Sequence, residues 1–296
     1  MIRLNALAAL LLGCGACSPS QAPPAANAAE AVQAPPQRLG FDPFYRKYVD
    51  AGGIPVIGSD RVPDRALIAA RDTVLAMLAK RPDLHADMVR RGVRVGVMAA
   101  EETTTDLPEH RHWKKPTLDD SGLTQCERKT WAIYAAMSDR EYWHRRARGT
   151  GGTFTTVGAE NLLAEPGGRY FGENILVHEF AHAVLDAIQS ADPPLYHEIG
   201  RAYRAATAAG KWKGDYASVT IQEYWAEGTQ YWFDTNMLAR LEEGPVRSSE
   251  DLVRYDPALA GALAKAYAER RRLPSDPFHR HLAQLNVPEG YKSADC

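Results

Sequence analysis

Residues 175–184 read ILVHEFAHAV, which places His178, Glu179 and His182 in an otherwise apolar run. The apolar spacing around this run predicts a helix over residues 174–190. Residues four apart on a helix project from one face, so the two imidazoles would lie one turn apart. Two explanations are open: these side chains are satisfied core residues, or they are buried because they form a metal site.

The arrangement of these three side chains suits a hydrolytic metal site. Two neutral imidazoles one turn apart can share a single zinc ion. Glu179 points about 100° around the helix, so it can lie beside the metal and act as a base toward a bound water. The apolar residues of the run would provide a low-dielectric wall that strengthens the electrostatics of the site. The pattern favours zinc, and two satisfied histidines with a surface glutamate are the structural alternative.

A catalytic zinc ion normally has three protein ligands and one position for water. The extended pattern HExxHxxGxxH needs Gly at 185 and His at 188, but the chain has Leu185 and Ile188, so that pattern is excluded. Further along, the run QEYWAE places Glu223 and Glu227 four residues apart on one helix face. Glu223 could complete the ligand set, and Glu227 could accept the free N–H of a ligand histidine and fix its tautomer.

Other uses of Glu223, and other third ligands, are open. Thr220 and Glu223 fit the capping-box signature, in which the carboxylate would bond the helix terminus and not a metal. Asp186, His197 and Glu198 are alternative donors near the two histidines in sequence. A site closed by a fourth protein ligand, such as His197 or Asp186, would stabilise the fold without catalysis.

HEFAH followed about forty residues later by ExxxE resembles the gluzincin metallopeptidases, the broad group of thermolysin. More narrowly, residues 216–227, YASVTIQEYWAE, are similar to the catalytic segment of the anthrax lethal-factor type of peptidase. That family has HEFGH, a tyrosine seven residues before the ligand glutamate, and an aromatic-aromatic-Ala-Glu continuation. The resemblance covers roughly residues 170–235, and Gln222 stands where thermolysin-like enzymes have Asn.

The resemblance implies a zincin-like α+β domain, helix-rich with a small sheet, that uses zinc to cleave a peptide or protein substrate. It implies a zinc ligand set of three side chains: His178, His182 and Glu223. Glu179 would be the general base, and Tyr216 would stabilise the oxyanion or protonate the leaving group. Glu227 would support a ligand histidine. Substrate preference does not carry over, because residues 41–169 contain no motif that can be assigned.

Periodicity predicts the other elements of a mixed α+β domain. Strands are expected at 93–98 and 154–157, and helices at 63–80, 83–92, 174–190, 196–209 and 220–241. Asp83 would cap the second helix, and Pro193-Pro194 would break the chain before the helix at 196–209. Aromatic side chains on the last helix are expected in the core: Tyr224, Trp225, Tyr231, Trp232 and Phe233.

Two further segments are interpreted as connections. Residues 101–116 form a polar stretch with His110 and His112, which could bind metal but are expected to be solvated. Residues 148–153, RGTGGT, are rich in glycine but lack the strand–GxGxxG–helix context of a nucleotide loop, so a turn is expected there.

The chain has 296 residues, of which 45% are apolar and 24% charged, and its formal net charge is -2. These values are ordinary for a soluble globular protein of one large domain or two closely packed lobes. No basic block stands out, which argues against electrostatic binding of nucleic acid.

The N-terminus predicts export. Residues 1–13 are typical of a lipoprotein signal peptide, with an apolar run too short to span a bilayer. The run ends in LLGC, which resembles the bacterial lipobox and implies acylation of Cys14. Residues 14–40 are then a Pro/Ala-rich tether, and residues 41–296 are the catalytic domain. Gly15, and not Asp, follows the cysteine, so a location at the outer membrane or facing the periplasm is expected. A plain secretory signal is the alternative.

These features predict an exported, lipid-anchored zinc metallopeptidase, attached to the membrane through its N-terminus. The alternatives are a non-catalytic, zinc-stabilised cell-envelope lipoprotein that binds a partner or polymer, and a zincin-fold hydrolase of a non-peptide substrate. Cys126 and Cys296 belong to the predicted domain, and export would permit a disulfide, but their positions do not decide whether they pair.

Overall fold

The computed structural model describes residues 31–120, 123, 128–166, 168, 170–237, 245–267, 269 and 271–279. Within these residues helices dominate and the strands form one small sheet, so the predicted mixed α+β class is confirmed. The predicted signal peptide, Cys14, Cys126 and Cys296 lie outside the described residues. In the part of the chain that is described, no helix has both the length and the apolar character needed to cross a membrane.

Over the described residues, the sheet has five strands in the order β1-β2-β3-β5-β4. β2, β3 and β5 are parallel to one another, whereas β1 and β4 are antiparallel strands at the two edges. The predicted strands at 93–98 and 154–157 are confirmed as β3 and β5. The bounds are β1 (Lys47–Ala51), β2 (Ile54–Gly58), β3 (Arg94–Met98), β4 (Gly149–Thr150) and β5 (Phe154–Gly158).

Both faces of the sheet are covered, which explains why β2, β3 and β5 are buried at nearly every position and not at every second one. On one face, α1 (Asp64–Leu78) packs against β1, β2 and β3, and α7 (Ile175–Ala191) packs against β4 and β5. A second, smaller cluster holds five buried side chains: Tyr45, Tyr48, Ile57, Met98 and Leu107.

The smaller cluster also involves the segment for which composition predicts a tether. Leu39, in the 3-10 helix η1 (Gln37–Leu39), packs against the cluster. Gln33 exchanges two backbone hydrogen bonds with Tyr48, of 2.9 and 2.7 Å. The fold therefore includes residues from the C-terminal part of the 14–40 segment.

The two helices predicted between β2 and β3 are present, but the second has a different cap. α1 corresponds to the helix predicted at 63–80, and the next helix is α2 (Pro82–Arg90). Arg81 is its N-cap residue, so the prediction that Asp83 caps it was wrong. Asp83 lies in the first turn and pairs with the Arg81 guanidinium at 2.6 Å. Its negative charge is still favourable at a helix N-terminus.

In the described residues between β3 and β4 there are three short helical elements: η2 (Thr104–Asp106), α4 (Trp131–Ala135) and α5 (Asp139–Arg146). The expectation of two solvated histidines is wrong for His110, which is 7% exposed, whereas His112 is exposed. His110 stacks on Trp113, with ring centroids 3.9 Å apart. Burial lowers the pKa of His110 to about 4, so its ring is neutral at pH 7. This histidine is therefore part of the packing.

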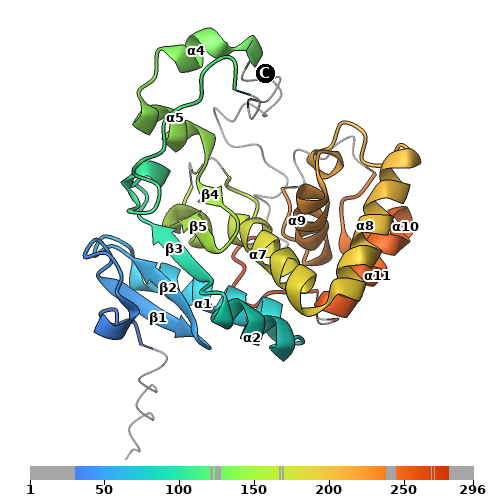
Figure 1. Ribbon diagram of the computed structural model, residues 1–296, viewed down its shortest axis with the longest axis horizontal. Coiled ribbons are helices and arrows are strands. Elements are labelled where there is room, and N and C mark those ends of the chain that lie inside the picture. Colours follow the sequence, from blue (N-terminus) through green and yellow to red (C-terminus); the bar gives the residue numbers. More distant parts are fainter. Residues whose placement is uncertain are drawn as a thin grey trace, which may run out of the picture.

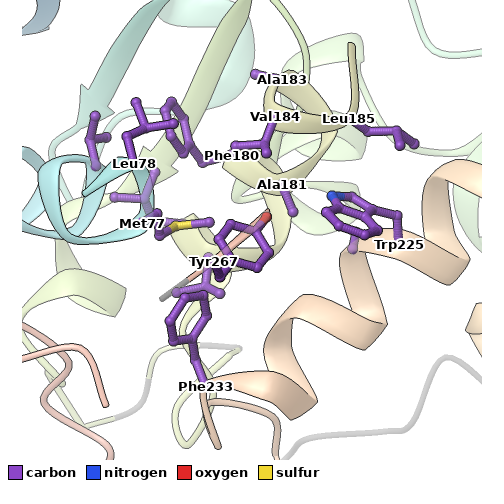
Figure 2. Packing of buried hydrophobic residues seen from close by; sticks show 14 of the residues in the cluster. Met77, Leu78, Phe180, Ala181, Ala183, Val184, Leu185, Trp225, Phe233 and Tyr267 are labelled. Atoms are coloured by element: carbon purple, nitrogen blue, oxygen red, sulfur yellow. The ribbon is translucent and has the colours of Figure 1, made fainter. Parts of the chain in front are cut away.

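α7 runs through the centre of the molecule, between the sheet with α1 and α2 and the C-terminal helices (Figure 1). Asn174 caps it, because its side chain accepts the backbone N–H of Val177 at 3.4 Å. Figure 2 shows apolar residues of α7 packed with side chains of α1 and α9. α7 is buried around most of its circumference, as expected for a largely apolar helix enclosed by its neighbours. Of the polar residues of HEFAH, His178 is consequently buried, and Glu179 and His182 are partly buried.

The helix that follows α7 begins at Pro193-Pro194 and not after these two prolines. α8 (Pro193–Ala208) starts at Pro193, whereas the sequence pattern predicted its start at residue 196. A proline is tolerated in the first turn of a helix, where its missing N–H has no partner in any case. Asp192 completes this start by accepting the backbone N–H of Leu195 at 3.2 Å.

The helix predicted at residues 220–241, which carries many aromatic side chains, is shorter than predicted. It is α9 (Ile221–Trp232), preceded by the 3-10 helix η3 (Tyr216–Ser218). Asp234 adopts a φ of 54°, which a right-handed helix cannot accommodate, so the helix ends before it. The five aromatic side chains expected in the core are each at most 3% exposed, which confirms that prediction. Among the described residues after α9 there are two helices that were not predicted from the sequence: α10 (Ser249–Tyr255) and α11 (Pro257–Ala266).

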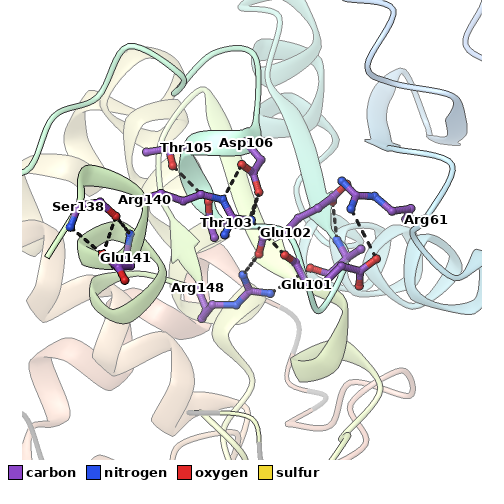
Figure 3. A network of polar contacts seen from close by, with 11 residues as sticks. Arg61, Glu101, Glu102, Thr103, Thr105, Asp106, Ser138, Arg140, Glu141 and Arg148 are labelled. Atoms are coloured by element: carbon purple, nitrogen blue, oxygen red, sulfur yellow. Dashed lines mark hydrogen bonds and ion pairs between the residues drawn. The ribbon is translucent and has the colours of Figure 1, made fainter.

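Arg148 fixes the start of β4. Its guanidinium makes two 2.8 Å hydrogen bonds with Glu160 of α6 (Ala159–Leu162). It also donates to the backbone carbonyls of Ala99 and Glu102, and Figure 3 shows it reaching toward Glu102. The Arg148 and Glu160 side chains are 5% and 13% exposed, so this ion pair is shielded from water.

We expect Arg148→Met to lower the free energy of unfolding by about 3–5 kcal/mol, because Glu160 would remain charged in a buried site. Arg140→Met is the control, since it removes an ion pair with Asp106 in which the arginine is 58% exposed. That change should cost less than about 1 kcal/mol. Urea unfolding of both purified variants measures the difference, and equal losses would contradict the role of burial.

Candidate metal centre

Three side chains from two helices converge beside the core. His178 and His182 come from α7 and Glu223 from the first turn of α9, and one donor atom of each lies within 4.8 Å of the others. Oε2 of Glu223 is 3.1 Å from Nε2 of His178 and 3.7 Å from Nε2 of His182. The side chains of His178, His182 and Glu223 are only 10%, 16% and 17% exposed. This group could hold a metal ion.

The donor set fits zinc in both chemistry and spacing. Two imidazole nitrogens and one carboxylate oxygen are ligands that zinc accepts in proteins. In a tetrahedral site with bonds of 2.0–2.1 Å, neighbouring donor atoms lie about 3.3 Å apart. The distances of 3.1 and 3.7 Å from Glu223 to the two histidines bracket this value. Small side-chain movements are therefore enough to place the three donors around one ion.

Glu223 faces the histidines although Thr220 caps α9. Oγ1 of Thr220 accepts the backbone N–H of Glu223 at 3.1 Å, so the cap uses the backbone and leaves the carboxylate available. The alternative in which the cap occupies that carboxylate is therefore wrong. Next to it, the Tyr224 hydroxyl donates to Asp256 at 2.7 Å, and Asp256 also accepts from the Trp212 indole at 2.9 Å. These bonds fix the rotation of α9 that turns Glu223 toward α7.

The second nitrogen of His178 is held by two further residues of α9. Nδ1 of His178 lies 3.1 Å from Oε1 of Gln230 and 3.4 Å from Oε1 of Glu227. The Gln230 amide donates to the carbonyl of Asn174 at 3.3 Å, which turns its oxygen toward the imidazole. Asn236 donates to Glu227 at 3.0 Å. An Nδ1–H held in this way points Nε2 toward Glu223 and the possible metal.

Gln230 was not among the residues singled out from the sequence, although a signal for it was present. Positions 223, 227 and 230 have the i, i+4, i+7 spacing of a single helix face. An amide oxygen, like a carboxylate oxygen, accepts a hydrogen bond from an imidazole N–H, so the same spacing argument applies to Gln230.

Glu179 lies on the side of α7 that faces the sheet. Its side chain packs against the backbone of β4 at Gly149. Burial raises the pKa of Glu179 to about 7, although the charge of His178 acts in the opposite direction. A carboxyl group with a pKa near 7 can both accept and release a proton near neutral pH.

The two histidines differ in their affinity for protons. Burial acts to lower the pKa of His178, but hydrogen bonds to Glu223 and Glu227 outweigh it and raise this pKa well above its ordinary value. Burial lowers the pKa of His182 to about 4. His182 is therefore neutral and able to ligate at pH 7, whereas His178 must release a proton when a metal binds.

Tyr216 lies at the start of η3, over the ring of His178. The two ring planes make an angle of 20° and their centroids are 6.2 Å apart. Asp215 holds this turn by accepting the backbone N–H of Ala217 at 2.8 Å. Burial of the phenol and the nearby Glu223 carboxylate raise the pKa of Tyr216, so its hydroxyl keeps its proton. Tyr216 as a whole residue is 50% exposed, so it borders the solvent while its phenol hydroxyl is shielded.

The alternative third ligands lie elsewhere. Asp186 pairs with Arg91 at 3.6 Å, and Glu198 pairs with Lys265 at 2.6 Å. His197 is exposed on α8. Among the described residues, none of these three belongs to the group formed by the two α7 histidines and the α9 glutamate.

We expect zinc to stabilise the folded protein and a chelator to reverse the effect. At a free zinc concentration about 100 times the dissociation constant, the gain should be about 2.7 kcal/mol. Glu223→Gln should lose most of this gain, because an amide is a poorer zinc ligand than a carboxylate. Asp186→Asn, on the same helix as the histidines but paired with Arg91, should retain it. Thermal unfolding with and without zinc measures these changes, and full stabilisation of Glu223→Gln would exclude that ligand.

The contact between Gln230 and His178 gives a second expectation. Gln230→Leu keeps a similar size but cannot accept the Nδ1–H, so zinc affinity should fall about 10-fold or more. Gln222→Leu is the matched control, since Gln222 is exposed on the same helix. Competition with a chelating dye measures both affinities. An unchanged affinity in Gln230→Leu would mean that Glu227 alone orients the histidine.

Comparisons with known proteins give no family for this chain. No family model matches the sequence, and searches of curated proteins and of solved structures found no match. Conclusions about function therefore depend on the positions and chemistry of the chain's own side chains.

Proposed function

We propose that this protein is an exported, lipid-anchored zinc metallopeptidase with a zincin-like catalytic domain of the gluzincin type. The observation that carries the proposal is the convergence of His178, His182 and Glu223 into one group of donor atoms within 4.8 Å of one another. The sequence places Glu179 directly after the first of these histidines, where a base for hydrolysis is needed. Three donors leave one tetrahedral position for a water molecule.

The reaction would divide among the residues as follows. Zinc bound by the three donors would lower the pKa of a bound water and polarise the carbonyl of the scissile bond. Glu179 would accept a proton from the attacking water and pass it to the leaving amine. The Tyr216 hydroxyl, which keeps its proton, would donate a hydrogen bond to the oxyanion that develops on the substrate.

Gln230 and Glu227 would keep the Nδ1 proton on His178, so that its Nε2 faces the ion throughout the reaction.

The alternative of a closed, non-catalytic zinc site has less support. It needs a fourth protein ligand, but Asp186 is held by Arg91 and His197 is exposed on another helix. In the described part of the chain, the group of potential ligands contains three residues. An open position for water is what separates a hydrolytic site from a structural one.

The proposed location depends on the N-terminal sequence alone. The apolar run, the LLGC motif and Cys14 support export and acylation, which would hold the enzyme at a membrane surface. The tether that follows would let the catalytic domain reach peptide or protein substrates in the cell envelope.

The decisive test is Glu179→Gln, assayed on a broad peptide library together with ester and non-peptide amide substrates. The variant should bind zinc as the parent does, because Glu179 is not among the three donors, and should lose about 10²–10⁴-fold in turnover. Glu198→Gln is the control, since Glu198 pairs with Lys265 on the surface and should not affect catalysis. Undiminished cleavage by Glu179→Gln would refute the mechanism, and cleavage of the non-peptide substrates alone would change the substrate class.

A further inference from the structure

The glycine-rich segment after Arg148 lies against the HEFAH helix. The sequence pattern predicted only a turn at residues 148–153, but the structure forms the edge strand β4 there. Gly149 and Thr150 pair with Val157 and Thr156 of β5, and the hydroxyl of Thr150 is 2.8 Å from that of Thr156. Successive residues of an extended chain point to opposite faces, so positions 149 and 151 share a face.

That shared face contacts Glu179 and His182 of α7. Within the part of the chain that the structure describes, neither side chain has hydrogen-bonded support like that of His178. A Cβ atom on Gly151 would lie 2.4 Å from Cδ2 of His182 and 2.8 Å from its Cβ and Cγ. A Cβ atom on Gly149 would lie 2.6 Å from Cγ2 of Ile175 and 2.9 Å from Cγ of Glu179. Distances this short cannot be accommodated without movement, so only glycine allows this approach.

The backbone conformation does not itself require glycine at these two positions. Gly152 has a φ of 106°, a region that favours glycine, and a Cβ atom there would meet nothing within 4 Å. Gly149 and Gly151 have no such positive φ. The reason for glycine at 149 and 151 is therefore the contact with α7.

His178 and His182 are held in different ways. Nδ1 of His178 has Gln230 and Glu227 as acceptors. Among the described residues, no hydrogen bond holds Nδ1 of His182, and its imidazole instead lies against Gly151. Gly151 directly follows β4, and that strand is fixed by pairing with β5 and by the buried Arg148–Glu160 ion pair. The rigid backbone at Gly151 thus restrains the His182 ring, as hydrogen bonds to Gln230 and Glu227 restrain the His178 ring.

We propose that Gly149 and Gly151 are positioning residues of the metal centre: the bare backbone at Gly151 sets the orientation of the His182 imidazole, and that at Gly149 sets the position of the Glu179 carboxylate. This inference rests on the proposed function. The two glycines act on different parts of the site, a ligand and a base, so their substitutions have separable effects.

The test compares three alanine variants of the full chain by zinc affinity and peptide turnover. Gly151→Ala should weaken zinc binding about 10-fold or more, as the loss of a residue that orients a ligand does. Gly149→Ala should keep zinc affinity within about twofold but reduce turnover, because Glu179 is displaced and is not a ligand. Gly152→Ala strains the hairpin without touching His182, so it should leave zinc affinity unchanged. Competition with a chelating dye gives the affinities, and urea unfolding of the metal-free forms reports on folding.

Two results would overturn the inference: zinc binding by Gly151→Ala as tight as that of the parent, or equal weakening in Gly152→Ala. If Gly151→Ala does not fold, the parent protein gives the answer by NMR. Nuclear Overhauser contacts between the His182 ring and the α-protons of Gly151 are then expected, and their absence would overturn the contact. Failure of the proposed function is a separate outcome, because there the parent itself would bind no zinc.

Discussion

The approach of the Glu223 carboxylate to the His178 imidazole is the interaction on which the rest of the site depends. It links α7 to α9 across 45 positions of sequence, inside a largely apolar setting where charges are costly unless they are compensated. Each helix is fixed independently of this contact. α7 is enclosed by the sheet and by neighbouring helices, and α9 is held by Thr220 at its start and by Tyr224 bonded to Asp256. The three potential donor groups are therefore brought together by contacts of the protein itself.

The parts of the site that follow helix periodicity could be predicted from the sequence. The spacings of His178 to His182 and of Glu223 to Glu227 each define one helix face, and the structure turns these two faces toward each other. Gln230 follows the same face and was within reach of the same argument. Spacing within a helix does not determine which other helix it meets, so the spacings left the third ligand open between Glu223 and other donors, and the family resemblance favoured Glu223.

Other features depend on contacts that no local pattern encodes. The burial of His110 results from stacking on Trp113, and glycine at 151 is explained by a ring that lies 31 positions later in the chain. The starts of α8 and α11 did have a local signal. At α8 it was missed because Pro193-Pro194 was interpreted as a break before the helix. Asp192 before Pro193 and Asp256 before Pro257 each accept an N–H three residues on, at 3.2 Å. An Asp-Pro pair followed by helix formers is a start signal for a helix.

Asn174 connects three segments that are far apart in the sequence: the start of α7, the α9 residue Gln230 and the residue Asp276. Its side chain caps α7 and donates to the buried Asp276 at 3.0 Å, while its carbonyl receives the Gln230 amide. The helix that carries both histidines is thus tied to a residue 102 positions after its cap. A growing chain has synthesised HEFAH long before it has made Asp276. The Asn174 cap of that helix therefore gains its contact with Asp276 only after all three donor residues of the candidate site have been made.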